Sequence, residues 1–124
     1  MSKKAKKNDD KEDNHISGWY NCTDPALEDL LQPADRIEFD ETGYKHWGLF
    51  VGLHGSSNDD TAGNVVHLSK EKGGIRLEML NKLNEQRARK NNKADESMNP
   101  FEPSKIVENA LNSVNKENIY FCKL

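Results

Sequence analysis

The sequence has few cysteines and no long apolar run, and each shortage excludes a class of protein. Cys22 and Cys122 are the only cysteines in 124 residues, which is too few for a disulfide framework or a cysteine-based zinc site. No apolar run approaches the roughly 18 residues that a membrane span requires. The lysine-rich start, residues 1–7, is not followed by an apolar segment, so it does not have the form of a secretory signal peptide. We therefore expect a cytoplasmic protein without a transmembrane segment.

The charged residues, 31% of the chain, are separated into blocks of opposite sign. Residues 24–60 contain nine acids and two bases, whereas residues 70–93 contain eight bases and three acids. A basic segment of this size suits the phosphate groups of lipids or nucleic acids. A solvated surface is the favoured interpretation, and we expect no nucleic-acid partner.

The length allows one domain, preceded by a tail. Residues 1–17 show no apolar periodicity and are predicted to be a disordered, charged tail, so the domain is expected to span residues 18–124. Only 34% of the chain is hydrophobic, but these residues concentrate between Ile37 and Leu80 and again after Phe101. A modest core is therefore expected in these two regions.

The apolar spacing predicts strands first and one substantial helix later. Thr23 or Asp24 should cap a short helix with Pro25 in its first turn. The residues from 81 to 99 form a polar insert with no clear buried face. Strands are expected at 36–39, 46–53, 64–68, 75–79 and 118–124, and a helix capped by Ser104 at 104–114. This order predicts an α+β fold, an antiparallel sheet meander with one packed C-terminal helix.

Two histidines stand on neighbouring predicted strands. His46 opens one strand and His67 lies inside the next. A symmetric hairpin between them would offset the rings by about three residues, or roughly 10 Å, and a bulge or an asymmetric loop would close that gap. Neighbouring imidazoles can act as a base and its orienting partner in nucleophilic catalysis. The pattern alone also fits two hydrogen-bonded structural histidines, which is the favoured interpretation at this point, and it predicts neither a metal nor a cofactor.

Three segments resemble the lecithin:retinol acyltransferase-like family, which includes the HRAS-like phospholipases and acyltransferases. The resemblance covers about residues 30–124. Tyr-x-His-Trp together with Val-Val-His-Leu is the most specific part of it. The matching segments are Pro-Ala-Asp-Arg-Ile-Glu-Phe at 33–39, Tyr-Lys-His-Trp-Gly-Leu-Phe-Val-Gly at 44–52 and Val-Val-His-Leu at 65–68.

The resemblance implies a fold, a substrate and roles for both histidines. The fold would be permuted papain-like, related to that of the NlpC peptidases. His46 matches the catalytic histidine of the family, and His67 matches its second, orienting histidine. A cysteine thiolate would attack an acyl ester of a phospholipid, and the resulting acyl-thioester would pass its acyl group to water, an amine or an alcohol. Contact with the membrane would be peripheral.

The family's nucleophile has no evident match in the sequence. In the family it lies in an Asn-Cys-Glu-His-Phe-like segment after the last strand, and here residues 118–124 match that strand with no Asn-Cys after them. A truncated enzyme, an inactive interaction module and a substitute cysteine all remain open. Cys122 lies a few residues too early, within the strand. Cys22 has the chain order of an NlpC-type thiol peptidase, but it precedes His46 by only 24 residues.

Overall fold

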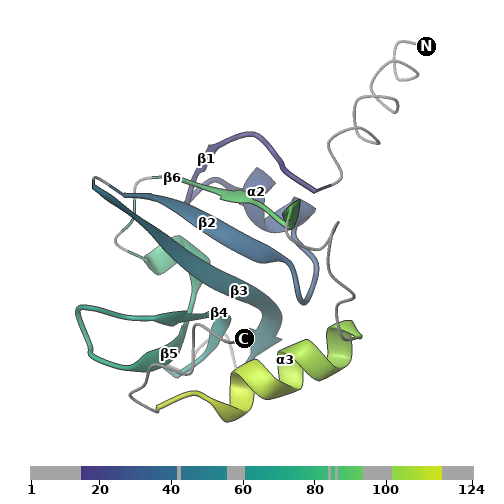
Figure 1. Ribbon diagram of the computed structural model, residues 1–124, viewed down its shortest axis with the longest axis vertical. Coiled ribbons are helices and arrows are strands. Elements are labelled where there is room, and N and C mark those ends of the chain that lie inside the picture. The colour runs from purple at the N-terminus through teal and green to yellow at the C-terminus, as the bar shows by residue number, and fades with distance from the viewer. Residues whose placement is uncertain are drawn as a thin grey trace.

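The computed structural model describes residues 15–41, 43–55, 61–83, 85, 87–93 and 102–115. They form an antiparallel six-stranded sheet in the order β1-β6-β2-β3-β4-β5, with helices packed against it (Figure 1). The α+β class is therefore confirmed, and β2 to β5 form the expected meander. The elements are β1 (Tyr20–Asn21), α2 (Pro25–Leu30), β2 (Arg36–Glu41), β3 (Tyr44–His54), β4 (Gly63–Leu68), β5 (Ile75–Glu78), the 3-10 helix η1 (Leu80–Lys82), β6 (Arg87–Lys90) and α3 (Pro103–Asn112).

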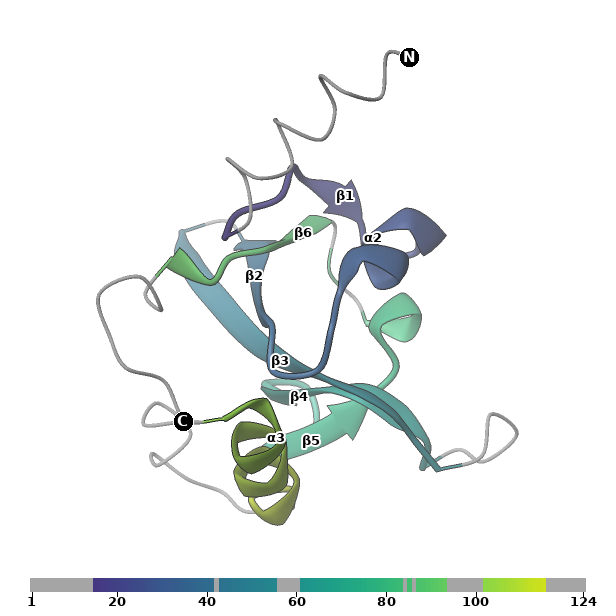
Figure 2. The same ribbon diagram turned by 90° about the vertical axis from the view of Figure 1, so that its right-hand side faces the viewer.

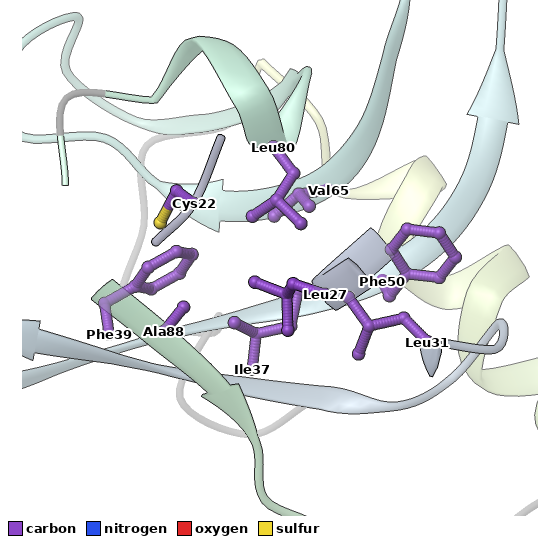
Figure 3. Packing of buried hydrophobic residues seen from close by; sticks show 9 residues of the cluster. All are labelled: Cys22, Leu27, Leu31, Ile37, Phe39, Phe50, Val65, Leu80 and Ala88. Atoms are coloured by element: carbon purple, nitrogen blue, oxygen red, sulfur yellow. The ribbon is translucent and has the colours of Figure 1, made fainter. Parts of the chain in front are cut away.

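The helices α2 and α3 cover opposite faces of the sheet. Because successive residues of a strand point to opposite faces, the same strands contribute side chains to the packing on both sides. Figure 2 shows α2 and α3 on either side of the strands. On one face, buried residues of α2 pack with β2, β3, β4, η1 and β6, as Figure 3 shows for Cys22, Leu27, Leu31, Ile37, Phe39, Phe50, Val65, Leu80 and Ala88. On the other face, Ala110 of α3 packs with Leu49, Val51, Val66 and Ile75. The sheet is thus the middle layer between two small cores.

The start of α2 follows its sequence signals. The Asp24 side chain accepts a hydrogen bond from the backbone N–H of Ala26 at 2.9 Å, and Pro25 occupies the first turn. A proline is tolerated there because its missing N–H would have no helical partner. Leu27 then enters the core, fully buried.

Replacing Asp24 with alanine is expected to lower the free energy of unfolding by about 1 kcal/mol, because an N-cap acceptor is lost. Urea denaturation followed by circular dichroism would measure the change. Asp29→Ala, an exposed change in the same helix, serves as the control and should cost less than about 0.5 kcal/mol. Equal losses in the two variants would contradict the capping role.

The predicted polar insert contains a strand that the sequence analysis missed. Within residues 81–99, β6 pairs with both β1 and β2, and Ala88 is fully buried opposite Phe39. Its other three residues are basic, so no apolar alternation marked it. The arginines of β6 form ion pairs with carboxylates of β2. Arg89 Nε lies 2.9 Å from Glu38 Oε1, and Arg87 forms an ion pair with Asp40.

The basic segment 70–93 is therefore divided among separate partners. Arg87 and Arg89 meet carboxylates of β2, while Lys72 meets Glu78 of β5. The two arginine pairs connect β6 with β2, and the lysine pair connects β5 with the turn before it. The Arg89–Glu38 pair is largely buried, with side chains 25% and 3% exposed, so the segment is not a solvated surface throughout.

The two ends of the domain differ in detail from the expectations. The N-cap of α3 is Glu102 and Pro103 is its first residue, so Ser104 is not the cap as predicted. A proline at the first helical position explains this shift. Ile16 and Ser17, which were assigned to the tail, bond to the end of β6. The predicted strand at 118–124 and most of the tail lie outside the described residues.

Within the described ranges, no helix has the length and apolar character needed to cross a membrane.

Candidate active site

The structure brings the two sequence-predicted histidines into direct contact. Nε2 of His46 lies 3.0 Å from Nδ1 of His67, and the two rings are nearly perpendicular, at 83°. His67 is buried, with 4% of its surface exposed, whereas His46 is partly exposed. The outer ring is therefore reachable, and the inner ring supports it.

A register shift in the hairpin accounts for this contact. His67 pairs with Gly48, two residues along β3 from His46, so both rings are on the same face of the sheet. The pairing shifts between Phe50 and His54, and without that shift the His54–Gly63 register would place His67 opposite Phe50. The shift thus moves the rings closer by two residues, or about 7 Å along the strand. This register shift closes the gap that the symmetric hairpin would leave between the two rings.

The Phe39 ring of β2 packs against the imidazole rings of both His46 and His67. Its ring centroid lies 5.1 Å from that of His46 and 6.4 Å from that of His67. Gly48 allows this approach, because a Cβ at that position would lie only 3.1 Å from Phe39 Cε2 and 3.1 Å from Val65 Cγ1. The histidine pair therefore rests on the edge of the apolar core.

Glu78 extends the pair to a chain of three groups, and the sequence analysis did not identify it. Its Oε2 lies 2.9 Å from Nε2 of His67, and its Oε1 lies 3.1 Å from Nζ of Lys72. His67 pairs with Arg76 across β4 and β5, so Glu78 is two residues further along β5 on the same face. The alternation of β5 showed that Arg76 and Glu78 share one face of the strand. The register between β5 and β4, which places Glu78 beside His67, could not be predicted from the sequence.

The three groups border an open hollow of about 390 Å³. Further charged side chains line it, among them Glu41, Lys70 and Lys82. In the described part of the chain, no group of three or more His, Cys, Asp or Glu side chains is arranged so that it could hold a metal ion. A ligand in the hollow would therefore meet the imidazole of His46, which is hydrogen-bonded to that of His67, which in turn is hydrogen-bonded to the carboxylate of Glu78.

Burial keeps both imidazoles neutral. It lowers the pKa of His46 from its ordinary value of 6.5 to about 4, and the nearby positive charges of His67 and Lys70 act in the same direction. Burial also lowers the pKa of His67, although the hydrogen bond and charge of Glu78 oppose this. Both rings are therefore neutral imidazoles at neutral pH, the form that carries a basic nitrogen.

Acidification is expected to destabilise the fold between about pH 6.5 and pH 4 through His46. Above this window His46 is neutral in both the folded and unfolded chains. Within this window the unfolded chain binds a proton that the folded chain does not, so the free energy of unfolding decreases as the pH decreases. His46→Gln should therefore lose less stability than the wild type between pH 7 and pH 4.5, as measured by urea midpoints, while Leu53→Ala on the same strand should follow the wild type. An unchanged pH dependence in His46→Gln would count against this assignment.

Cys22, one of the two candidate substitute nucleophiles, lies in the apolar core. It is 3% exposed, packs in the cluster with Phe39 (Figure 3) and does not line the hollow. Burial, together with the charge of Glu41, raises the pKa of its thiol to about 11. Because the thiolate is the attacking form, such a thiol is a poor nucleophile, which weighs against the peptidase alternative. Cys122 lies outside the described residues.

The class defined so far is an α+β domain with a paired-histidine site on two adjacent interior strands, β3 and β4, of an antiparallel sheet. Comparison with known proteins shows that the chain is similar in sequence to phospholipase A and acyltransferase 3. It is 29% identical to the mouse protein over an alignment of 98 positions that covers 72% of this chain, and the human and Pongo abelii proteins show the same identity and coverage. The resemblance found in the sequence is thereby confirmed.

The match is partial in length. The chain spans 60% of the length of each of these relatives. No family model matches the chain. No solved structure matches it either.

Proposed function

We propose that the chain provides the histidine pair of a phospholipase or acyltransferase that acts on phospholipids at a cytoplasmic membrane surface through peripheral contact. The observation that carries the proposal is the 3.0 Å contact between His46 and His67 beside an open hollow, in a homologue of phospholipase A and acyltransferase 3. In this proposal the fold is the permuted papain-like one, in which the histidine strands precede the nucleophile.

His46 acts as the base and His67 as its orienting partner. His46 takes the proton of a cysteine thiol, and the thiolate attacks the carbonyl carbon of a phospholipid ester. The ester C–O bond breaks, a thioester bond forms, and His46 returns the proton to the departing lysophospholipid oxygen. Water, an amine or an alcohol then attacks the thioester, gives its proton to His46 and leaves as the acylated product, while the thiol is regenerated.

The thiol itself is assigned to a residue outside the described part of the chain. Among the described residues that line the hollow, none is a cysteine. Cys122 is one candidate, and the complete reading frame of the gene decides whether another follows. A negatively charged thiolate beside His46 would raise the pKa of that imidazole, because an opposite charge favours its protonated form.

The test measures fatty acid and lysophospholipid released from phosphatidylcholine vesicles by the complete gene product. We expect release that is lost in His67→Gln and in His46→Gln but retained in His54→Gln. His54 is a suitable control because it lies on β3 and bonds to the backbone of Val51, at 3.2 Å from its carbonyl oxygen, rather than to the site. Vesicle binding without release would replace the proposal with its alternative, an inactive lipid-interaction module.

A further inference from the structure

Glu78 has a position that the proposed mechanism does not yet use. It is the last residue of β5, and its side chain is 16% exposed beside a His67 side chain that is 5% exposed. One carboxylate oxygen faces His67 and the other faces Lys72. Both oxygens therefore have a fixed partner.

The backbone around Glu78 leaves it little freedom. A Cβ on Gly63 of the neighbouring strand would lie 2.7 Å from the backbone nitrogen of Glu78, so the two strands approach closely there. The turn before β5 holds Lys72 in place, because its backbone N–H donates to Ser69 Oγ at 3.0 Å and its carbonyl accepts from Arg76 at 3.1 Å. The carboxylate is thus positioned from two sides.

While Glu78 is ionised and both rings are neutral, the hydrogen bonds that link His46, His67 and Glu78 allow only one assignment of donors and acceptors. A carboxylate only accepts hydrogen bonds, so Nε2 of His67 must carry the proton that it donates to Glu78. Nδ1 of the neutral His67 ring is then an acceptor, and Nε2 of His46 must donate to it. His46 consequently carries its proton on Nε2, and its Nδ1 holds the free lone pair.

We propose that Glu78 is a positioning residue that sets the tautomer of both histidines and thereby makes Nδ1 of His46 the basic nitrogen. The role of that nitrogen toward a thiol rests on the proposed function, whereas the tautomers themselves do not. The proposal deepens the roles of His46 and His67 by assigning the proton on each ring to a third residue.

The ionised state that the proposal needs is supported by the surroundings of Glu78. Burial acts to raise the pKa of its carboxyl group, but the hydrogen bonds from His67 and Lys72 outweigh this, and the pKa is lowered. Glu78 is therefore a carboxylate at neutral pH, with Lys72 balancing its charge.

The direct test is the protonation pattern of the two rings in long-range ¹H–¹⁵N spectra of the chain at pH 7. We expect both His46 and His67 to carry the proton on Nε2. A proton on Nδ1 of His67 in the wild type would overturn the proposal without any variant. The spectrum needs no turnover, so its result is independent of the vesicle assay of the proposed function.

Glu78→Gln tests whether the carboxylate causes this pattern. Glutamine can either accept through its oxygen or donate through its nitrogen, so both tautomers of His67 become possible. We expect a measurable population of His67 with the proton on Nδ1, and a lower pKa of His67, because the charge that raises it is removed. Glu108→Gln, an equal charge change at a 63% exposed side chain of α3, should leave the spectrum unchanged.

A folded Glu78→Gln variant with the wild-type tautomers would overturn the positioning role. If this variant does not fold, the wild-type spectrum still decides between support and rejection. Wild-type rings protonated on Nε2, combined with no His46-dependent release of fatty acid, would reject the proposed function and leave the tautomer assignment in place.

Discussion

His46→Gln is expected to reduce the release of fatty acid from phosphatidylcholine by about 10³-fold, within the range that positioned acid–base groups contribute. Nδ1 of His46 is the proposed acceptor of the thiol proton and the proposed donor to the leaving oxygen, so both halves of the reaction lose the same group. Glutamine keeps a side-chain amide that can bond to His67, which limits damage to the fold. The initial rate at saturating vesicle concentration measures the effect.

Two comparisons separate this loss from a general defect. His54→Gln should keep a rate close to that of the wild type, and the thermal melts of all three proteins should remain cooperative. A His46→Gln variant that releases fatty acid within about threefold of the wild-type rate would remove His46 from the mechanism, since a missing general base costs at least about 10²-fold.

Phe39→Ala is expected to lower the free energy of unfolding by about 4 kcal/mol, the typical cost of truncating a buried aromatic residue to alanine. Phe39 is 1% exposed and lies among the core residues of the α2 face (Figure 3). The cavity would lie beneath both imidazoles, because the Phe39 ring is within 6.4 Å of each of theirs. Urea denaturation measures the loss of stability.

The control for Phe39→Ala is Leu53→Ala, a truncation of a large side chain that is 56% exposed on β3. It should cost less than about 0.5 kcal/mol, as surface changes generally do. A loss below about 1 kcal/mol in Phe39→Ala would mean that Phe39 is not the packed support of the site that the structure describes.

The histidine site shows what strand patterns can and cannot predict. An apolar run and a short β-branched segment placed His46 and His67 on adjacent strands, and the symmetric hairpin left them about three residues apart. The register shift lies near Gly52, whose φ of +78° is a backbone conformation that favours glycine. A glycine within a strand does not reveal from the sequence how far the register is shifted. The contact itself therefore required the structure.

The strand β6 and the role of Glu78 were missed by the sequence analysis because both depend on pairing between strands. β6 contains one apolar residue, Ala88, and its arginines are satisfied by carboxylates of β2 about 50 residues earlier. Glu78 has an ordinary strand position, and only the β4–β5 register aims it at His67. Local patterns carry the apolar faces of a sheet, whereas polar pairings between strands depend on register.

The central claim is that the His46–His67 pair activates a thiol for acyl transfer from a phospholipid. The most direct measurement is the intact mass of the complete gene product after brief incubation with phosphatidylcholine vesicles, followed by peptide mapping. The account predicts one acyl group on a single cysteine, absent in His46→Gln. An acyl adduct that persists in His46→Gln, or no adduct in a wild-type protein that releases fatty acid, would contradict it.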